Sequence, residues 1–183
     1  MSVNRNSYVN RNSYVNRGSC VDDLYRKLKN KAIQLLSRRE HGVAELIDKL
    51  SVARQTDVLL REQRHEVAQR VVEELLQRDY VSDERFAEMT VRGRANQGRG
   101  PMRIRQELQQ KKVPGEIAEQ AMEASDIDWF ANAVVMREKK FGLDVVSDMK
   151  LKAKQQRFLQ YKGYGFDHIQ HAMDAINSAY DEY

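Results

Sequence analysis

The chain has 183 residues, of which 41% are hydrophobic and 32% are charged, and its formal net charge is +4. This length suits one domain or a short series of small modules. Two prolines and nine glycines are too few for the turns of an all-β sandwich, and the longest apolar runs are far too short to span a membrane.

The single cysteine, Cys20, excludes an intrachain disulfide and a cysteine-rich metal site. The N-terminal residues are polar throughout, without the apolar core of a secretory signal. We therefore expect a cytoplasmic protein.

A short repeat opens the chain. Residues 3–8, Val-Asn-Arg-Asn-Ser-Tyr, recur at 9–14 and begin again at 15–17. This hexapeptide offers little apolar surface for folding. We expect residues 1–19 to form a disordered basic arm.

From Asp22 onward, apolar residues recur at helical spacing. The first three expected helices carry apolar positions within 24–36, 43–50 and 67–75. Ser82-Asp83-Glu84 supplies an N-cap and an acidic first turn for a fourth helix. Gly100-Pro101 ends that helix and begins a fifth, because proline is tolerated in a first helical turn.

Four more helices follow in the second half of the chain. Pro114 opens the sixth, and Asp126 or Asp128 begins the seventh. The eighth and ninth are marked by the apolar residues Leu151, Phe158, Leu159, Phe166, Ile169, Met173 and Ile176. These nine helices predict an all-α fold.

A weak internal repeat groups the helices in threes. A shift of 51 residues (159 − 108) places Leu108 on Leu159, and a shift of 58 (108 − 50) places Leu50 on Leu108. Three-helix units have small cores, so neighbouring units must stack to bury enough apolar surface. We predict an elongated, curved tandem array of three repeats, at 20–80, 81–125 and 126–183.

Charge is concentrated in two basic blocks. Residues 90–113 contain seven basic residues and one acidic residue, and residues 149–166 contain five basic residues and no acidic one. Such blocks are candidate contacts for a polyanion, the alternative being a salt-bridged surface. The candidate contact residues are Arg92, Arg94, Arg99, Arg103, Arg105, Lys111, Lys112, Lys150, Lys152, Lys154, Arg157, Tyr161 and Lys162.

The eighth helix organises part of the second block. Lys150, Lys154, Arg157 and Tyr161 follow i, i+4, i+7, i+11 spacing, which places them on one stripe of one face. Tyr161 and Tyr164 are candidates for stacking on exposed bases, and packing in the third repeat's core is the alternative. Phe158 fits the core better.

No catalytic constellation is found. The sequence from Gly93 to Gly98 has the spacing of a phosphate loop but lacks the following Lys-Ser/Thr. His168 and His171 have no third metal ligand at a suitable spacing, and Cys20 has no histidine at one. We expect a protein that is not an enzyme and uses no metal or cofactor.

Two segments of the sequence resemble the signature of a known protein family. Residues 80–87, Tyr-Val-Ser-Asp-Glu-Arg-Phe-Ala, and 98–108, Gly-Arg-Gly-Pro-Met-Arg-Ile-Arg-Gln-Glu-Leu, resemble the central signature of the RecX regulatory proteins. Residues 126–129 and 156–164 resemble its later part, and the likeness covers about 22–178. Asp79 and Lys112 stand where the family usually has glycine, which puts the geometry of two turns in doubt.

The resemblance implies a negative modulator of the RecA recombinase, built from three-helix repeats and acting in DNA recombination and repair. Its partner would be the RecA nucleoprotein filament, with single-stranded DNA contacted directly or through RecA. It would lodge in the filament groove as a monomer, without a membrane, and inhibit filament extension, ATP hydrolysis and strand exchange. The alternative is a stand-alone single-stranded nucleic-acid-binding protein that uses the basic stripes and tyrosines. A helix-turn-helix transcription factor ranks third, because nothing indicates a dimer.

Overall fold

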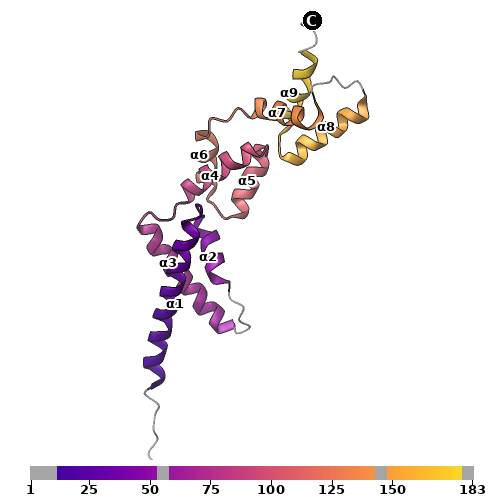
Figure 1. The fold of residues 1–183 in the computed structure, drawn as a ribbon. Coiled ribbons are helices and arrows are strands. Elements are labelled where there is room, and N and C mark those ends of the chain that lie inside the picture. Colours follow the sequence, from indigo (N-terminus) through magenta and orange to yellow (C-terminus); the bar gives the residue numbers. More distant parts are fainter. Residues whose placement is uncertain (1–11, 53–57, 143–147, 179–183) are drawn as a thin grey trace, which may run out of the picture. The chain divides into compact units, whose positions relative to one another are not determined.

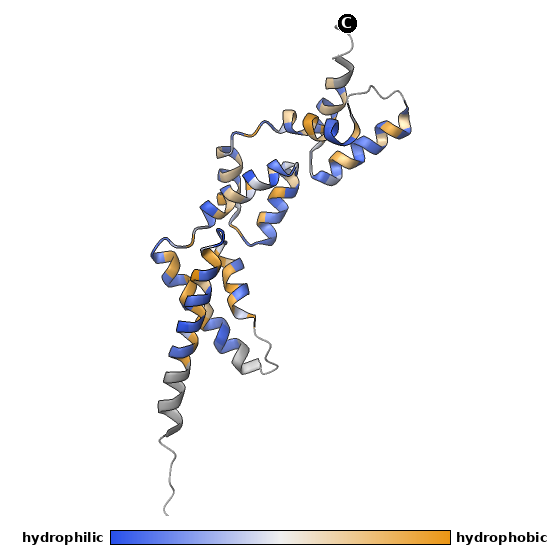
Figure 2. Cartoon of the chain, viewed as in Figure 1, coloured by the Kyte–Doolittle hydropathy of each residue, from blue (hydrophilic) through white to orange (hydrophobic). Residues whose placement is uncertain are grey.

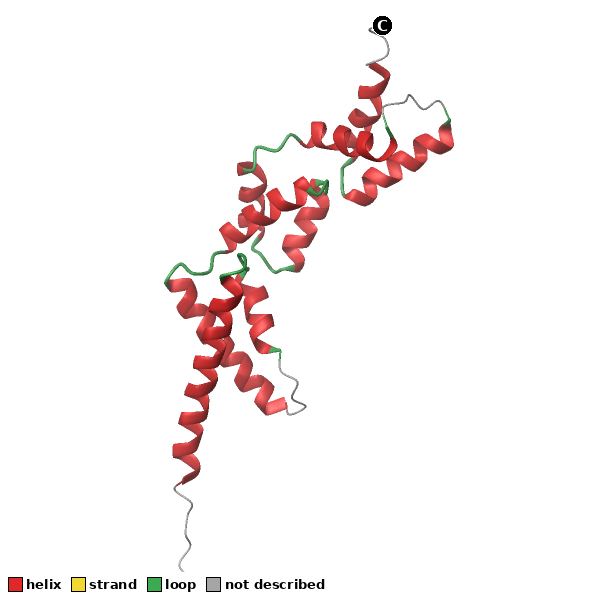
Figure 3. Cartoon of the chain, in the orientation of Figure 1, coloured by secondary structure: helices red, strands yellow, loops and turns green. Residues whose placement is uncertain are grey.

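The structure is a computed structural model that describes residues 12–52, 58–142 and 148–178, and the side chains of 21–52, 62–142 and 148–175. In these ranges every regular element is a helix (Figures 1 and 3), so the all-α prediction is confirmed. No helix in these ranges is long and apolar enough to cross a membrane. The helices are α1 (Asn12–Leu36), α2 (Val43–Ser51), α3 (Val58–Gln77), α4 (Asp83–Asn96), α5 (Pro101–Gln110), α6 (Gly115–Ala124), α7 (Trp129–Phe141), α8 (Met149–Lys162) and α9 (Phe166–Ser178).

The helices pack in triplets. The most extensive helix contacts are those between α1 and α3, α4 and α6, and α7 and α9, the first and third members of each triplet. Hydrophobic and hydrophilic residues alternate around the helices (Figure 2), as expected when each helix buries one face. The predicted three-helix repeats are therefore confirmed, and the curvature of the array stays a prediction.

The chain divides into two compact units. One comprises Met1–Arg39 and Glu45–Val81, and the other comprises Glu40–Ala44 and Ser82–Tyr183. The second unit contains α4–α9 and holds two clusters of buried apolar residues, one for each of its triplets. The predicted repeat boundaries at 80/81 and 125/126 stay a prediction.

The register of the internal repeat agrees with burial. Leu50, Leu108 and Leu159, which the two shifts superpose, are all fully buried. Val113 and Tyr164, which the shift of 51 aligns in the turns before α6 and α9, are also buried. The same positions thus form the core of successive triplets.

Helix α1 begins at Asn12, earlier than the expected start near Asp22. Residues 12–19 of the predicted arm are therefore helical, and residues 1–11 lie outside the described residues. Extending an existing helix costs much less than nucleating one, because each added residue gains a backbone hydrogen bond. The apolar pattern marks where a helix packs and does not mark where it ends.

The expected helix starts carry N-caps. The Ser82 hydroxyl accepts a hydrogen bond from the Arg85 N–H at 3.0 Å. Of the two candidates for α7, Asp128 is the cap, and its carboxylate accepts from the N–H groups of Phe130 and Ala131. Gly100 and Pro101 begin α5 as predicted.

The turns at Asp79 and Lys112 keep the geometry that glycine favours. Both residues have left-handed φ values, 58° and 59°. After Lys112, the Val113 N–H donates to the Leu108 carbonyl at 3.1 Å, and Gly163 in the α8–α9 turn has the same arrangement with φ of 95°. This pattern is a Schellman motif. The left-handed geometry expected of glycine at these two turns is therefore present without glycine.

Candidate nucleic-acid interface

Main-chain hydrogen bonds join the N-terminus of α5 to the C-terminus of α8. The Gly100 N–H donates to the Lys162 carbonyl at 2.8 Å, and the Met102 N–H donates to the Gly163 carbonyl at 3.1 Å. These are groups that isolated helices leave without partners at their ends. A Cβ atom on Gly100 would lie 2.4 Å from the Gly163 carbonyl carbon, so the contact requires a residue without a side chain.

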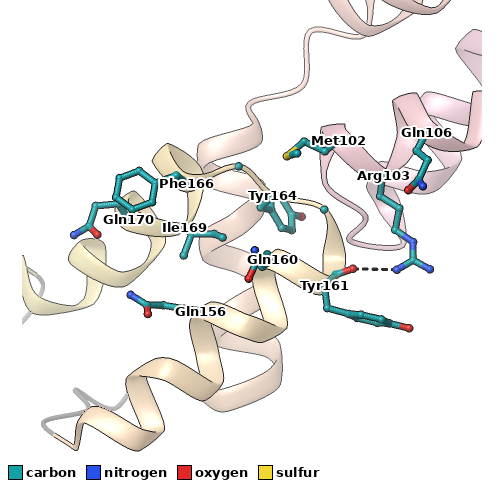
Figure 4. Close-up of a pocket in the computed structure, with 12 residues that line it drawn as sticks. Met102, Arg103, Gln106, Gln156, Gln160, Tyr161, Tyr164, Phe166, Ile169 and Gln170 are labelled. Carbon is teal, nitrogen blue, oxygen red and sulfur yellow. Dashed lines mark hydrogen bonds between the residues drawn. The ribbon is translucent and has the colours of Figure 1, made fainter. Parts of the chain in front are cut away.

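Arg103 completes this junction. Its Nη1 donates to the Tyr161 carbonyl at 3.0 Å, and its guanidinium lies 5.0 Å from the centre of the Tyr161 ring (Figure 4). The Tyr161 side chain is 71% exposed. The structure thus joins two predicted contact residues, and Tyr161 packs outside the core.

A groove of about 660 Å³ opens beside the junction. Helix α5 contributes Met102, Arg103 and Gln106 to its wall, and α8, the α8–α9 turn and the start of α9 supply the rest (Figure 4). The volume falls within the usual range for small-molecule sites.

The predicted cationic stripe of α8 lies on an exposed face. Lys150, Lys154, Arg157 and Tyr161 are all exposed, and Lys152 is half-buried. Within the described part of the chain, the three lysines form no ion pair. The stripe therefore presents its ammonium groups to solvent. Lys162 is half-buried, with its ammonium 5.6 Å from the centre of the Phe158 ring.

Arginines of the first basic block are held by carboxylates. Glu107 accepts from Arg94 Nε at 2.9 Å and from Arg99 Nη1 at 2.8 Å. The hydrogen bond with Glu107 raises the pKa of the Arg94 guanidinium. Here the salt-bridged surface, the alternative that the sequence left open, describes the structure.

Two further arginines of this block form exposed ion pairs. Arg92 pairs with Glu88 at 3.2 Å and Arg105 with Glu119 at 2.8 Å. The hydrogen bond from Arg105 lowers the pKa of Glu119. Exposed pairs contribute little and exchange easily, so these two arginines stay accessible to a stronger anion. Lys111 and Lys112 lie at the C-terminal end of α5, half-buried and exposed respectively.

Tyr164 is not available for stacking, and of the two alternatives that the sequence left open, packing in the core of the third repeat describes it. Its side chain is 1% exposed, and its hydroxyl donates to Asn132 Oδ1 at 2.5 Å. Burial raises the pKa of the hydroxyl to about 12. Tyr164 lies in the α8–α9 turn, where helical periodicity does not indicate the direction of a side chain.

Comparisons with known proteins identify the family. Residues 82–122 match the family model of the RecX second three-helix domain, and residues 126–173 match that of the third. The regulatory protein RecX of Acinetobacter baylyi is 41% identical over 82% of this chain and 88% of its own length. That of Vibrio parahaemolyticus is 42% identical over 79% of this chain and 88% of its own length.

The chain belongs to the RecX family.

Solved RecX structures share this fold. The crystal structure of RecX from Lactobacillus salivarius superposes with a TM-score of 0.66 at 23% identity, covering 85% of this chain and 98% of that one. A second crystal structure of regulatory protein RecX gives a TM-score of 0.68 at 17% identity, covering 95% and 81%. At these identities the likeness supports the fold alone.

The sequence did not predict several groove residues of this RecX chain. These are the four glutamines Gln106, Gln156, Gln160 and Gln170, together with Met102 and Phe166. The charge pattern of the sequence could not indicate the glutamines, because their amides are neutral. The groove itself could not be predicted, because it joins segments more than 40 residues apart in the sequence. The one available signal is the i, i+4 spacing of Gln156 and Gln160 on α8.

The histidine pair of this RecX chain packs on an aromatic ring. The rings of His168 and His171 lie 4.6 and 5.3 Å from that of Phe130. Burial lowers the pKa of His168. Among the side chains that the structure describes, no group of three or more metal-ligating residues is found.

Proposed function

We propose that this chain is a negative regulator of RecA. It binds the filament that RecA forms on single-stranded DNA and inhibits filament extension, ATP hydrolysis and strand exchange. It acts as a monomer, by occupying the filament and without chemistry of its own. Membership of a family of regulatory proteins supports the proposal.

The stripe of Lys150, Lys154 and Arg157 carries this proposal. Residues 149–166 contain no acidic residue, so the charge of the stripe is not neutralised along its own segment. A row of exposed cations on one helix face attracts phosphates or an acidic protein surface. A nucleoprotein filament offers such anionic groups along its length.

RecA's DNA-dependent ATPase tests the proposal. With saturating single-stranded DNA, we expect the wild-type protein to inhibit ATP hydrolysis at concentrations well below that of RecA. Replacing Lys150, Lys154 and Arg157 together by glutamate should raise the inhibitory concentration by about tenfold or more, because attraction becomes repulsion.

The matched control reverses three lysines outside both basic blocks, Lys27, Lys139 and Lys140, all of which are exposed. This variant has the same net charge as the stripe variant and should inhibit like wild type. Full ATPase activity with excess wild-type protein would refute the proposed function. Equal loss in the two variants would refute the role of the stripe.

A second candidate is a single-stranded nucleic-acid binder that works without RecA. The exposed Tyr161 ring beside the Arg103 guanidinium favours it, because aromatic and guanidinium planes stack on bases. It predicts tight DNA binding in the absence of RecA, with an affinity that falls steeply as salt rises.

A further inference from the structure

We propose that the groove between α5 and α8–α9 receives an unstacked base of single-stranded DNA, with the α8 stripe holding the adjacent phosphates. The inference deepens the proposed function and rests on it, because the proposed function supplies single-stranded DNA as the ligand. It assigns a separate task to each of two neighbouring surfaces of α8.

Main-chain contacts hold the two sides of the groove together. The two main-chain hydrogen bonds from Gly100 and Met102 hold α5 against the end of α8. A Cβ atom on Gly163 would lie 2.4 Å from the Arg103 Cβ, which shows how closely the two segments approach. A site with its walls set in advance loses little conformational entropy when a ligand enters.

The groove walls carry free amide groups. Gln106, Gln156 and Gln160 are exposed, and their side chains form no hydrogen bond within the described part of the chain. Gln170 donates to Asp174 at 2.9 Å. An amide offers a donor and an acceptor side by side, which matches the paired donors and acceptors on a base edge.

Aromatic rings lie at the rim of the groove. Tyr161 and Phe166 line it and are 71% and 79% exposed (Figure 4). Arg103 donates to the main-chain carbonyl of Tyr161, which places its guanidinium 5.0 Å from the centre of the Tyr161 ring. This cation–π contact favours one position of the ring before a ligand arrives. Rings exposed to this extent serve as stacking platforms for bases, and the stacking depends little on which base is present.

The charge pattern favours a nucleic acid over a polypeptide. Among the described residues, Arg103 is the one charged residue that lines the groove, and it already bonds the Tyr161 carbonyl. The cations Lys150, Lys154 and Arg157 lie outside the groove, on the stripe of α8 that ends at Tyr161. Neutral amides and rings next to a row of cations reproduce the alternation of bases and phosphates along a single strand.

The experiment compares two probes of equal charge by fluorescence anisotropy, without RecA. One is a ten-nucleotide oligodeoxythymidylate, and the other is an abasic strand of the same length. We expect wild-type protein to prefer the thymidylate by about fivefold or more, since stacking adds affinity for each base. Tyr161→Ala and the double change Gln156→Leu with Gln160→Leu should remove the preference.

Three controls separate the two surfaces. Tyr161→Phe keeps the ring and should keep the preference, and Tyr80→Ala removes a 60% exposed tyrosine outside the groove and should leave binding unchanged. Lys150→Glu with Lys154→Glu should weaken both probes alike. The helical circular dichroism and melting temperature of each variant confirm that it is folded.

Equal binding of the two probes by wild-type protein would overturn the inference, as would a preference that survives both groove changes. If the groove variants instead lose RecA inhibition while wild type shows no base preference, the groove takes a polypeptide and the base assignment is wrong. The comparison of the two probes is made without RecA, so the base assignment and the proposed function can fail separately.

Discussion

Lys112 holds a backbone conformation that glycine adopts more readily. Its φ of 59° places Cβ close to the following carbonyl, which costs an L-residue roughly 1 kcal/mol. We predict that Lys112→Gly stabilises the protein by about 0.5 kcal/mol, because the relief of strain exceeds the extra chain entropy of glycine. Thermal unfolding followed by circular dichroism measures the change.

The neighbouring Lys111 provides the control. Its φ is −82°, so glycine there relieves no strain and adds flexibility. Lys111→Gly should lower the melting temperature. If both substitutions lower it equally, the left-handed conformation at residue 112 carries no cost.

At the level of single residues, the sequence predicted position on a helix better than accessibility in a turn. Lys150, Lys154 and Arg157 are exposed as their spacing predicted, because helical periodicity assigns each residue to a face. The pairing of Arg94 and Arg99 with Glu107 was not predictable, because Arg94 and Glu107 lie on different helices. Their meeting depends on how α4 and α5 pack.

At the scale of helix ends, the junction of α5 with α8 is a contact that a single substitution should disrupt. Gly100 has an ordinary φ of −77°, so alanine there introduces no backbone strain. Its Cβ would nevertheless lie 2.4 Å from the carbonyl oxygen of Gly163. We predict that Gly100→Ala destabilises the protein by about 2 kcal/mol or more, through overpacking and loss of the hydrogen bond to Lys162.

Gly115→Ala is the matched control. Gly115 begins α6, and nothing lies within 4 Å of a Cβ atom built there. This substitution should leave the melting temperature unchanged or raise it slightly. A Gly100→Ala variant as stable as wild type would show that the junction can separate without cost.

The sequence located the helices through their end signals. Ser82, Gly100-Pro101 and Pro114 correctly marked the starts of α4, α5 and α6. These signals could not predict the groove, because its walls come from three helices and its lining is mostly uncharged. Local patterns specify elements, whereas a site between elements depends on packing that one sequence does not display.

At the scale of the molecule, the side chains that the structure describes in the second compact unit form two apolar clusters of unequal size. Its α4–α6 triplet buries ten residues in one cluster, and its α7–α9 triplet buries four, Ala133, Leu159, Tyr164 and Ala172. We predict that a fragment of residues 82–183 folds on its own and melts cooperatively. A smaller fragment, 126–183, should not, because its core is too small.

Circular dichroism melting curves of the two fragments check this prediction. A gradual, non-cooperative loss of helix in the larger fragment would contradict it. A sharp transition in the smaller one would show that a triplet is stable without its neighbour.

The junction between α5 and α8 is built from backbone groups, and this has an evolutionary consequence. Gly100 and Gly163 must stay glycine, because a Cβ atom on either would clash with the opposite segment. Most amino acids present the same amide and carbonyl, so the other residues around the junction can diverge while the hydrogen bonds of Gly100 and Met102 persist. The glutamines and aromatic rings of the groove face outward from the same helices and are not needed to hold them together. Relatives are therefore free to acquire new ligand preferences by changing a few outward side chains, with the scaffold inherited intact.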